Sequence, residues 1–274
     1  MSRRLGLGLA ALAAVVLVPA ALGAYPTPFA QQGGEGVASR DGALRFVAAK
    51  SGDDTVVRAL RSDGSVAMSR PVAGSFGIPL LTYKGPGGGL FHDGSAFVLQ
   101  SVGFGPETTF KIVDAGNLST RDTIALEGTF AYDALSPDGG TLYLIQHTSS
   151  DDLQHYVVRA YDLREHALLP GKIADKTQRG WVMQGFPAAR ATTPSGRWVY
   201  TMYWNPNGFP FVHALDTVAG VAHCVGFAAP RPNSSTVLDY TLTVKGKKLL
   251  VRMRSGVLYR SIDRTTWRVT KPKA

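Results

Sequence analysis

Five short turns, each carrying a glycine and each leading into an apolar run, recur along the chain. The marker glycines are Gly42, Gly94, Gly139, Gly196 and Gly246, spaced 52, 45, 57 and 50 residues apart. In the clearest copy, Ser136-Pro137-Asp138-Gly139 has the chemistry of a reversing turn, because Pro fixes φ, Asp caps locally and Gly accepts a positive φ. The run Thr141–Ile145 that follows is β-branched, aromatic and apolar, which is typical of a mostly buried strand. A similar unit at a nearly fixed spacing indicates a repeat protein.

Each copy continues into a third and a fourth strand, for example Tyr156–Tyr161 and Ala167–Leu169. Four antiparallel strands in about fifty residues, repeated around an axis, form the blade of a β-propeller. With 31 Gly, 16 Pro and only 18% charged residues, the composition is that of a turn-dense all-β protein. The sequence therefore predicts an all-β fold, a β-propeller of five four-stranded antiparallel blades. Six or seven blades would need repeats that the sequence does not show.

The run Leu135–Leu144, followed by a strand and then Tyr161-Asp162-Leu163, resembles the repeat of bacterial YVTN and WD40-like propeller proteins. Asp216-Thr217 is similar to the blade endings of that family. The Gly-His and Trp-Asp signatures of eukaryotic WD40 scaffolds are absent from the sequence. The resemblance implies the fold alone, since proteins with such repeats include binding proteins, lactonases and quinoprotein-like enzymes.

The N-terminus has the pattern of a secretory signal. Arg3 and Arg4 precede the apolar run Leu5–Val18, and small residues follow up to Gly23. We expect residues 1–23 to be a signal peptide and residues 24–274 a single propeller domain that is secreted, extracellular or associated with the cell wall. An uncleaved membrane anchor remains the alternative, although the run is shorter than the ~20 residues that a span requires.

The formal net charge of +9 is concentrated at the C-terminal end. From Leu242 onward there are ten Lys or Arg residues and one acid, whereas residues 24–241 carry 17 basic and 19 acidic residues. Clustered cations attract polyanions. For an exported protein this favours an anionic cell-wall polymer over nucleic acid, with contacts from Lys245, Lys247, Lys248, Arg252 and Arg254. A merely solvated face of the last repeat is the alternative.

The closing of the ring leaves two alternatives for the N-terminal segment. Either Tyr25–Ser39 supplies the innermost strand of the first blade or it completes the last blade. In a closed ring the basic tail is expected to lie near residues 25–40.

The loops that enter the innermost strands of a propeller converge on the channel mouth, where ligands usually bind. Six residues before the marker glycines, the equivalent positions are Gly36, Gly88, Asp133, Arg190 and Tyr240. Asp133 and Arg190 are thus predicted to be neighbours on adjacent blades. They form either a structural ion pair or polar anchors for a ligand, with Asp239 and Tyr240 opposite.

Loops between the second and third strands share that face. They contribute side chains suited to a carbohydrate or another polar ligand, because aromatic faces stack and amides hydrogen-bond: His147, His155, Trp204, Asn205 and Asn207. His147, Asp151, Asp152 and His155 also offer mixed metal ligands, but they lie in one loop without a recognised spacing, so no metal or cofactor is assigned. The turn of Leu135–Gln146 is expected on the opposite face and without a chemical role.

Cys224 is the single cysteine, which excludes an intrachain disulfide. A small buried hydrophobe is its expected role, the alternatives being a nucleophile or a metal ligand. His223 points to the other face of the strand and cannot form a catalytic couple with it.

Three functional hypotheses follow. The leading one is an exported, monomeric, non-enzymatic propeller that binds a ligand or protein partner on its loop and channel face. The second is a lactonase or glycosidase-like hydrolase that uses a carboxylate at the channel mouth, Asp133 or Asp239, as its base. The third is a cell-wall-associated structural module docked through the basic last blade.

Overall fold

A computed structural model describes residues 30–82, 85–103, 105–175, 182–205, 209–227 and 240–272. Within these ranges the regular elements are strands, grouped into five antiparallel sheets, and the predicted all-β architecture is confirmed. In the described part of the chain no helix has the length and apolar character to cross a membrane. The predicted signal peptide, residues 1–23, lies outside the described residues.

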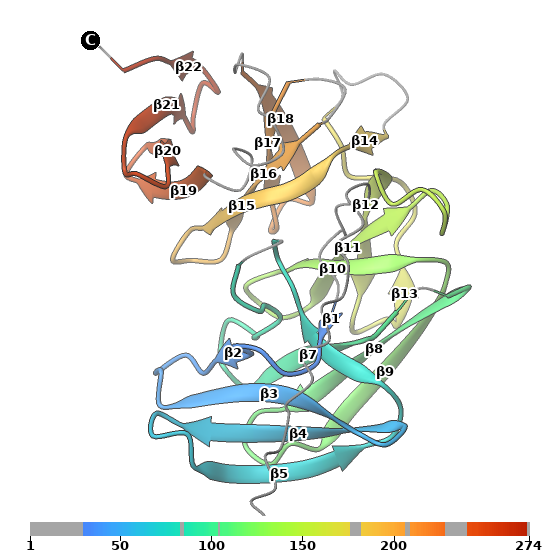
Figure 1. The fold of residues 1–274 in the computed structure, drawn as a ribbon. Helices are drawn as coiled ribbons and strands as arrows, with labels where there is room; N and C mark the ends of the chain where they lie inside the picture. The colour runs from blue at the N-terminus through green and yellow to red at the C-terminus, as the bar shows by residue number, and fades with distance from the viewer. Residues whose placement is uncertain are drawn as a thin grey trace, which may run out of the picture.

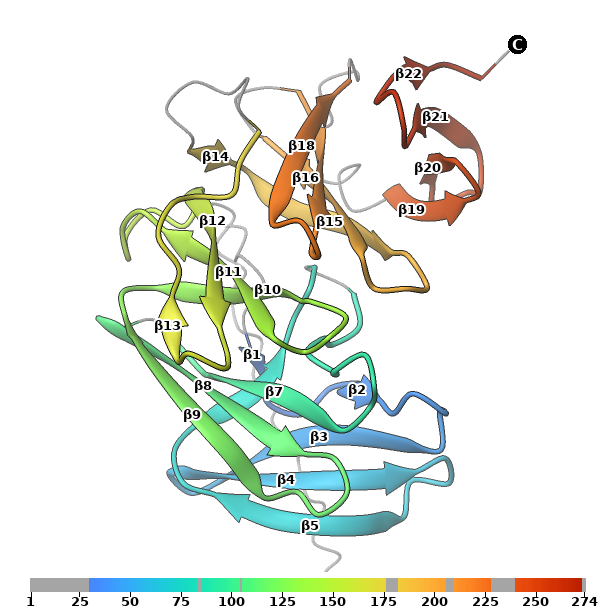
Figure 2. The ribbon, with the colours of Figure 1, turned by 180° about the vertical axis from the view of Figure 1, so that it is seen from behind.

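Each sheet runs from an innermost to an outermost strand, in chain order (Figures 1 and 2). The first sheet contains β2 (Val37–Ala38), β3 (Leu44–Ser51), β4 (Asp54–Arg61) and β5 (Val66–Val72). The second contains β6 (Phe76–Pro79), β7 (Ala96–Ser101), β8 (Glu107–Asp114) and β9 (Thr120–Glu127), with β1 (Ala30–Gln31) paired to β6. The third contains β10 (Phe130–Leu135), β11 (Thr141–His147), β12 (His155–Asp162) and β13 (Ala167–Leu168), and β14 (Met183–Gln184) also pairs with β12.

The last two sheets follow the same order. The fourth contains β15 (Phe186–Thr192), β16 (Trp198–Trp204), β17 (Phe211–Asp216) and β18 (Val221–Gly226). The fifth contains β19 (Tyr240–Lys245), β20 (Lys248–Met253), β21 (Leu258–Asp263) and β22 (Val269–Thr270). All five marker glycines have φ between +55° and +77°, the left-handed conformation that their turns require. The repeat found in the sequence is therefore the blade of the structure.

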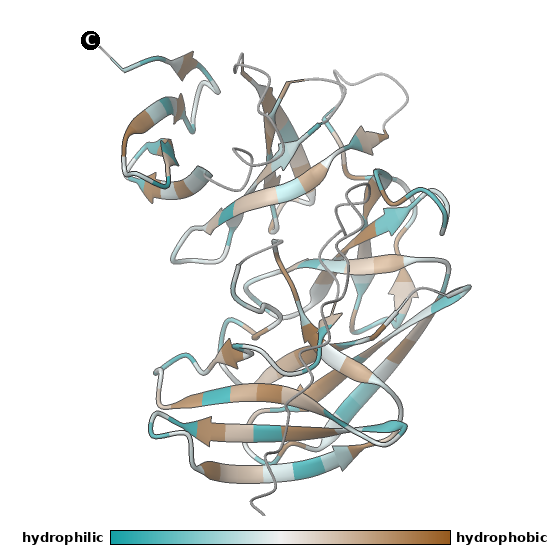
Figure 3. Ribbon diagram, viewed as in Figure 1, coloured by the Kyte–Doolittle hydropathy of each residue, from teal (hydrophilic) through white to brown (hydrophobic). Residues whose placement is uncertain are grey.

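Four hydrophobic clusters join neighbouring sheets, and each is formed by buried apolar side chains from the facing sides of two consecutive sheets. The first joins sheets one and two, where Phe46 stacks on Phe97 with ring centroids 4.6 Å apart. Figure 3 shows apolar and polar residues mixed along β3, β4 and β5, and along β4 the buried Thr55, Val57 and Ala59 alternate with more exposed residues, as expected for a sheet with one buried face. Burial between blades thus supplies the main cohesion of the fold.

The five sheets form an arc that does not close. Among the described residues no hydrophobic cluster joins the fifth sheet to the first, and Figures 1 and 2 show these two sheets at opposite ends of the arc. The expectation that the C-terminal tail lies near residues 25–40 is therefore not met. The physical reason is the outward face of the fifth sheet, where exposed Thr241, Thr243, Lys245 and Lys248 surround a single apolar residue, Leu250, which is too little apolar surface for another blade to pack on.

Two segments occupy the centre of the arc. Val37–Ala38 forms the innermost strand of the first sheet, as one of the two sequence alternatives proposed, whereas β1 pairs with β6 of the second sheet. The innermost strand of the second sheet is interrupted between Gly77 and Gly89: the chain turns back through the Leu80–Gly87 bridge and rejoins β7 at Leu90. The N-terminal segment that contains β1 and β2 and the stretch between Gly77 and Gly89 are thus the two segments that narrow the central channel.

Candidate functional site

Asp133 and Arg190, predicted as neighbours on adjacent blades, form an ion pair in the structure. Arg190 Nη1 lies 2.8 Å from Asp133 Oδ1 and 3.1 Å from the Thr201 hydroxyl oxygen, while Nη2 donates to the Asp133 carbonyl. The side chains are only 10% and 2% exposed. The pair thus links the third blade to the fourth inside the protein.

A β-bulge places Asp133 for this contact. The register between β10 and β11 shifts between Tyr132 and Ala134, so that Asp133 has no partner residue across the strand pair. Bulges re-aim a side chain in this way. Arg190 lies opposite Thr201 in the next blade. Because Asp133 is held by Arg190 and is buried, its carboxylate is not placed to act as a general base on a ligand in the channel.

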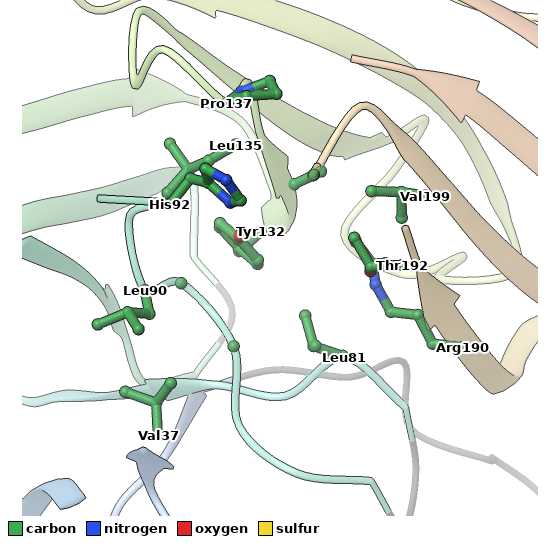
Figure 4. Close-up of a pocket in the computed structure, with 14 residues that line it drawn as sticks. Val37, Leu81, Leu90, His92, Tyr132, Leu135, Pro137, Arg190, Thr192 and Val199 are labelled. Atoms are coloured by element: carbon green, nitrogen blue, oxygen red, sulfur yellow. The ribbon is translucent and has the colours of Figure 1, made fainter. Parts of the chain in front are cut away.

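A pocket of about 220 Å³ lies in the channel against the first four blades (Figure 4). Its walls are mainly aliphatic, from Val37, Leu81, Leu90, Leu135, Pro137 and Val199. Four side chains with hydrogen-bonding groups also line it: His92, Tyr132, Arg190 and Thr192. An apolar hollow with a few polar groups is typical of a small-molecule site.

The pocket extends to the end of the channel where the marker glycines turn. Pro137, Gly196 and His92 belong to those turns, and a Cβ atom on Gly196 would lie 3.3 Å from the His92 Nδ1 atom. The expectation that the Leu135–Gln146 turn faces away from the site therefore differs from the structure, since Leu135 and Pro137 line the pocket. The reason is the pair of segments at the centre of the arc, which divide the channel, so that the pocket against the first four blades lies on the side of the marker turns.

A second cavity, of about 380 Å³, lies at that other end. It is lined by Gln31, Glu35 and several glycines, together with Leu80 and Gly87. Leu81 and Gly88, the next residues along the chain, line the first pocket. The Leu80–Gly87 bridge thus separates two chambers of one channel.

The remaining predicted site residues do not gather around the pocket. Tyr240 is buried between the fourth and fifth sheets beside Tyr259, with ring centroids 5.4 Å apart. His155 pairs with Asp152 in its own loop, and Trp204 packs beside Phe186 with ring centroids 6.2 Å apart. Asn205 follows β16 but does not line the pocket. Asn207 and Asp239 lie outside the described residues.

No group of three or more His, Cys, Asp or Glu side chains with metal-binding geometry occurs in the described part of the chain. His147, one of the four candidate ligands, is buried between blades beside Tyr156, with ring centroids 6.3 Å apart. The carboxylate of this loop that interacts with His147 is that of Asp152, which is already paired with His155.

Cys224 lies opposite His213 on the neighbouring strand, with the sulfur 3.5 Å from the His213 Nδ1 atom. Burial raises the pKa of the Cys224 thiol to about 12, with a further contribution from the Asp175 carboxylate. The thiolate needed for nucleophilic chemistry is thus strongly disfavoured.

The pocket residues His92, Tyr132 and Thr192 are absent from the sequence-based site. A signal for His92 exists, since His92 and Pro137 both lie two residues before a marker glycine and both line the pocket. Thr192 has a similar signal, since Leu90, Leu135 and Thr192 each lie four residues before a marker glycine and all three line the pocket. Tyr132 stands next to the bulge in β10, which the sequence does not reveal.

Two buried histidines make the stability of the protein pH-dependent. Burial lowers the pKa of both His147 and His213 from 6.5 to about 4, and this outweighs the opposing influence of nearby Asp152, Asp133 and Asp175. The unfolded chain therefore takes up protons first, and stability that is complete above pH 6.5 is lost as the pH falls toward 4. We expect the melting temperature to fall across this window, and to fall less in a His213→Asn variant. A flat profile in the wild type would contradict buried neutral histidines.

No protein-family model matches the sequence, and no curated protein sequence matches it. Solved structures with similar folds include Kuenenia stuttgartiensis hydrazine synthase, with a TM-score of 0.51, 16% identity and coverage of 83% of this chain and 63% of that chain. The β-propeller domain of Myceliophteria thermophila Cps50 (Swd1) has a TM-score of 0.50 and 12% identity, with coverage of 85% and 68%. The dihydro-heme d1 dehydrogenase NirN has a TM-score of 0.52 and 17% identity, with coverage of 90% and 47%.

The chain is a β-propeller. It spans between 47% and 68% of the length of these three structures. At such low identity the similarity establishes only the fold, so the function has to be argued from the residues of the site.

Proposed function

We propose that this β-propeller is an exported, monomeric, non-enzymatic module that binds a small ligand in its channel pocket. The observation that carries the proposal is the combination of aliphatic walls with the four polar side chains His92, Tyr132, Arg190 and Thr192. The pattern of Arg3 to Gly23 supports export. Among the described residues, no polar side chain that lines the pocket is a carboxylate or a thiol, which favours binding over hydrolysis.

The pocket limits the class of ligand. Its volume of about 220 Å³ is below the range of ~300–1,000 Å³ of sites for drug-sized molecules. The charge of Arg190 is already neutralised by Asp133, which weakens any preference for an anion. A compact, mostly apolar ring with one or two hydrogen-bonding groups, such as a small lactone or a deoxy sugar, fits these walls best.

Filling the pocket is expected to abolish binding. Thr192 is exposed to the channel, so Thr192→Phe adds bulk to the pocket without disturbing a core position. We expect compounds that raise the melting temperature of the wild type in a thermal-shift screen of lactones and sugars to bind this variant at least about tenfold more weakly, as measured by calorimetry.

The matched control is Thr123→Phe, which changes an exposed strand threonine on β9, away from the pocket. Binding to this variant should equal that of the wild type. Equal affinity of the Thr192→Phe variant and the wild type would contradict the location of the site, and turnover of a lactone or glycoside by the wild type would contradict a purely binding role.

A further inference from the structure

The fifth sheet has one apolar and one basic face. Along β19 burial alternates residue by residue, with Leu242 in the core shared with the fourth sheet and Thr241 and Thr243 exposed. On β20, Leu249 and Val251 belong to the same core. Because side chains alternate across a strand, Lys245 on β19 and Lys248 and Arg252 on β20 lie on the other face. We call this outward surface the basic face; it comprises Thr241, Thr243, Lys245, Lys248 and Arg252, with the apolar Leu250, 8% exposed, at its centre opposite Thr243.

The cations of the basic face are close together, and they outnumber the acidic residues near them. Lys245 lies directly opposite Lys248, and Thr241 lies directly opposite Arg252. Residues opposite each other have Cβ atoms roughly 5 Å apart, a distance at which like charges repel. Within the described ranges, neither lysine nor Arg252 makes a salt bridge; Arg252 donates to the Gly256 carbonyl. Asp263, the single acidic residue from Leu242 onward, lies opposite Lys248 and offsets part of this charge, while its Oδ1 atom accepts hydrogen bonds from the Thr265 and Thr266 amides of its own turn.

The first sheet, at the other end of the arc, also carries exposed positive charges on its outward face. On the first sheet, Phe46 and Ala59 face the second sheet, so Arg45 and Arg58 lie on the opposite face, where both are exposed. Docking of the first sheet onto the fifth, within one chain or between two copies, would bring these arginines toward Lys245, Lys248 and Arg252. Like charges at an interface oppose such docking, and the basic face is left open to a partner of opposite charge.

We propose that the basic face binds a linear phosphate-bearing polyanion. Lysine and arginine supply the charge, and the hydroxyl groups of Thr241 and Thr243 add hydrogen-bond donors between them. The aromatic side chains of this sheet, Tyr240, Tyr259 and Trp267, pack instead in or against the core shared with the fourth sheet. Single-stranded nucleic acids are held largely by base stacking on aromatic rings. The basic face therefore suits a polymer without bases.

Lys247 and Arg254 extend this surface at its two ends. Lys247 lies in the turn between β19 and β20, and Arg254 follows β20 in the turn toward β21. Both are exposed. The five cations that the sequence singled out are thus divided by the fold into three on one sheet face and two in the flanking turns.

Inorganic polyphosphate is the probe for this proposal. With the full chain, binding measured by calorimetry should weaken steeply as salt is added, because exposed charges are screened. The double variant Lys245→Glu/Lys248→Glu reverses two adjacent charges at exposed positions and is expected to bind at least about tenfold more weakly. Its melting temperature should match that of the wild type, since neither lysine belongs to the core.

The control variant Lys50→Glu/Lys172→Glu changes the net charge equally at exposed positions outside the fifth sheet. It should retain affinity within about twofold, since surface charges more than a Debye length away are screened.

Equal losses in the two variants would overturn the proposal in favour of a general charge effect. Tighter binding of a single-stranded DNA oligonucleotide of equal charge would overturn it in favour of nucleic acid, and a dimer present in the wild type and lost in the Lys245→Glu/Lys248→Glu variant would overturn it in favour of a second copy. Thr192→Phe should leave polyphosphate binding unchanged, so that this surface and the channel pocket are tested separately.

Discussion

Replacement of Arg190 by leucine is expected to destabilise the protein by about 3–5 kcal/mol. Asp133 is only 2% exposed and receives hydrogen bonds from Arg190 at both its carboxylate and its carbonyl oxygen. Without the guanidinium, the carboxylate would remain in the protein interior without a partner. The cost is the desolvation of that charge, and it far exceeds the value of the same pair at a surface.

Chemical denaturation of single and double variants measures this effect. An Asp133→Leu/Arg190→Met double variant should regain most of the lost stability, because removing both charges leaves no uncompensated ion. The control is Arg164→Leu, which breaks a pair with Asp138 whose side chains are 72% and 63% exposed and should cost at most about 1 kcal/mol. A cost below about 1 kcal/mol for Arg190→Leu would mean that water reaches Asp133 and that the two blades are not joined as described.

The sequence predicted the blades well because each blade is a local unit. Turn chemistry at Ser136-Pro137-Asp138-Gly139 and the apolar run that follows it both act within a few residues, and similar signals occur in every repeat. Counting from the marker glycines also placed Asp133 beside Arg190, although they are far apart in the chain. This succeeded because equivalent positions in successive blades occupy equivalent places around the axis.

The position of the pocket and the open arc could not be predicted from the sequence, because they depend on segments that lie outside the repeated blade pattern. The segment around β1 and the excursion between Gly77 and Gly89 belong to no blade pattern, yet they divide the channel into the pocket beside the marker turns and the cavity at the other end. The charge of Lys245 and Lys248 was visible in the sequence. What could not be foreseen is that they share one face with Thr241 and Thr243, because that depends on which side of β19 packs against the fourth sheet.

Replacement of Gly36 by alanine is expected to destabilise the protein by roughly 3 kcal/mol and to detach the inner strand of the first blade. Gly36 has φ +67°, and a Cβ atom there would lie 2.1 Å from the Phe46 carbonyl oxygen and 2.7 Å from a methyl carbon of Val47. The next residue, Val37, begins β2, packs in the first core and lines the channel pocket. The clash cannot be relieved by a rotamer change, since the nearest atom belongs to the backbone.

Gly42→Ala separates the clash from the backbone strain. Gly42 has φ +71°, nearly the same as Gly36, but a Cβ atom at this position would have no heavy atom within 4 Å beyond its chain neighbours. Its substitution should cost only the strain of a left-handed residue, about 1–2 kcal/mol. Chemical denaturation compares the two variants, and faster amide hydrogen exchange at Val37 and Ala38 in the Gly36→Ala variant alone would report the detached strand. Equal costs for the two substitutions, with unchanged exchange at Val37, would mean that β2 does not depend on the close approach of Gly36 to Phe46.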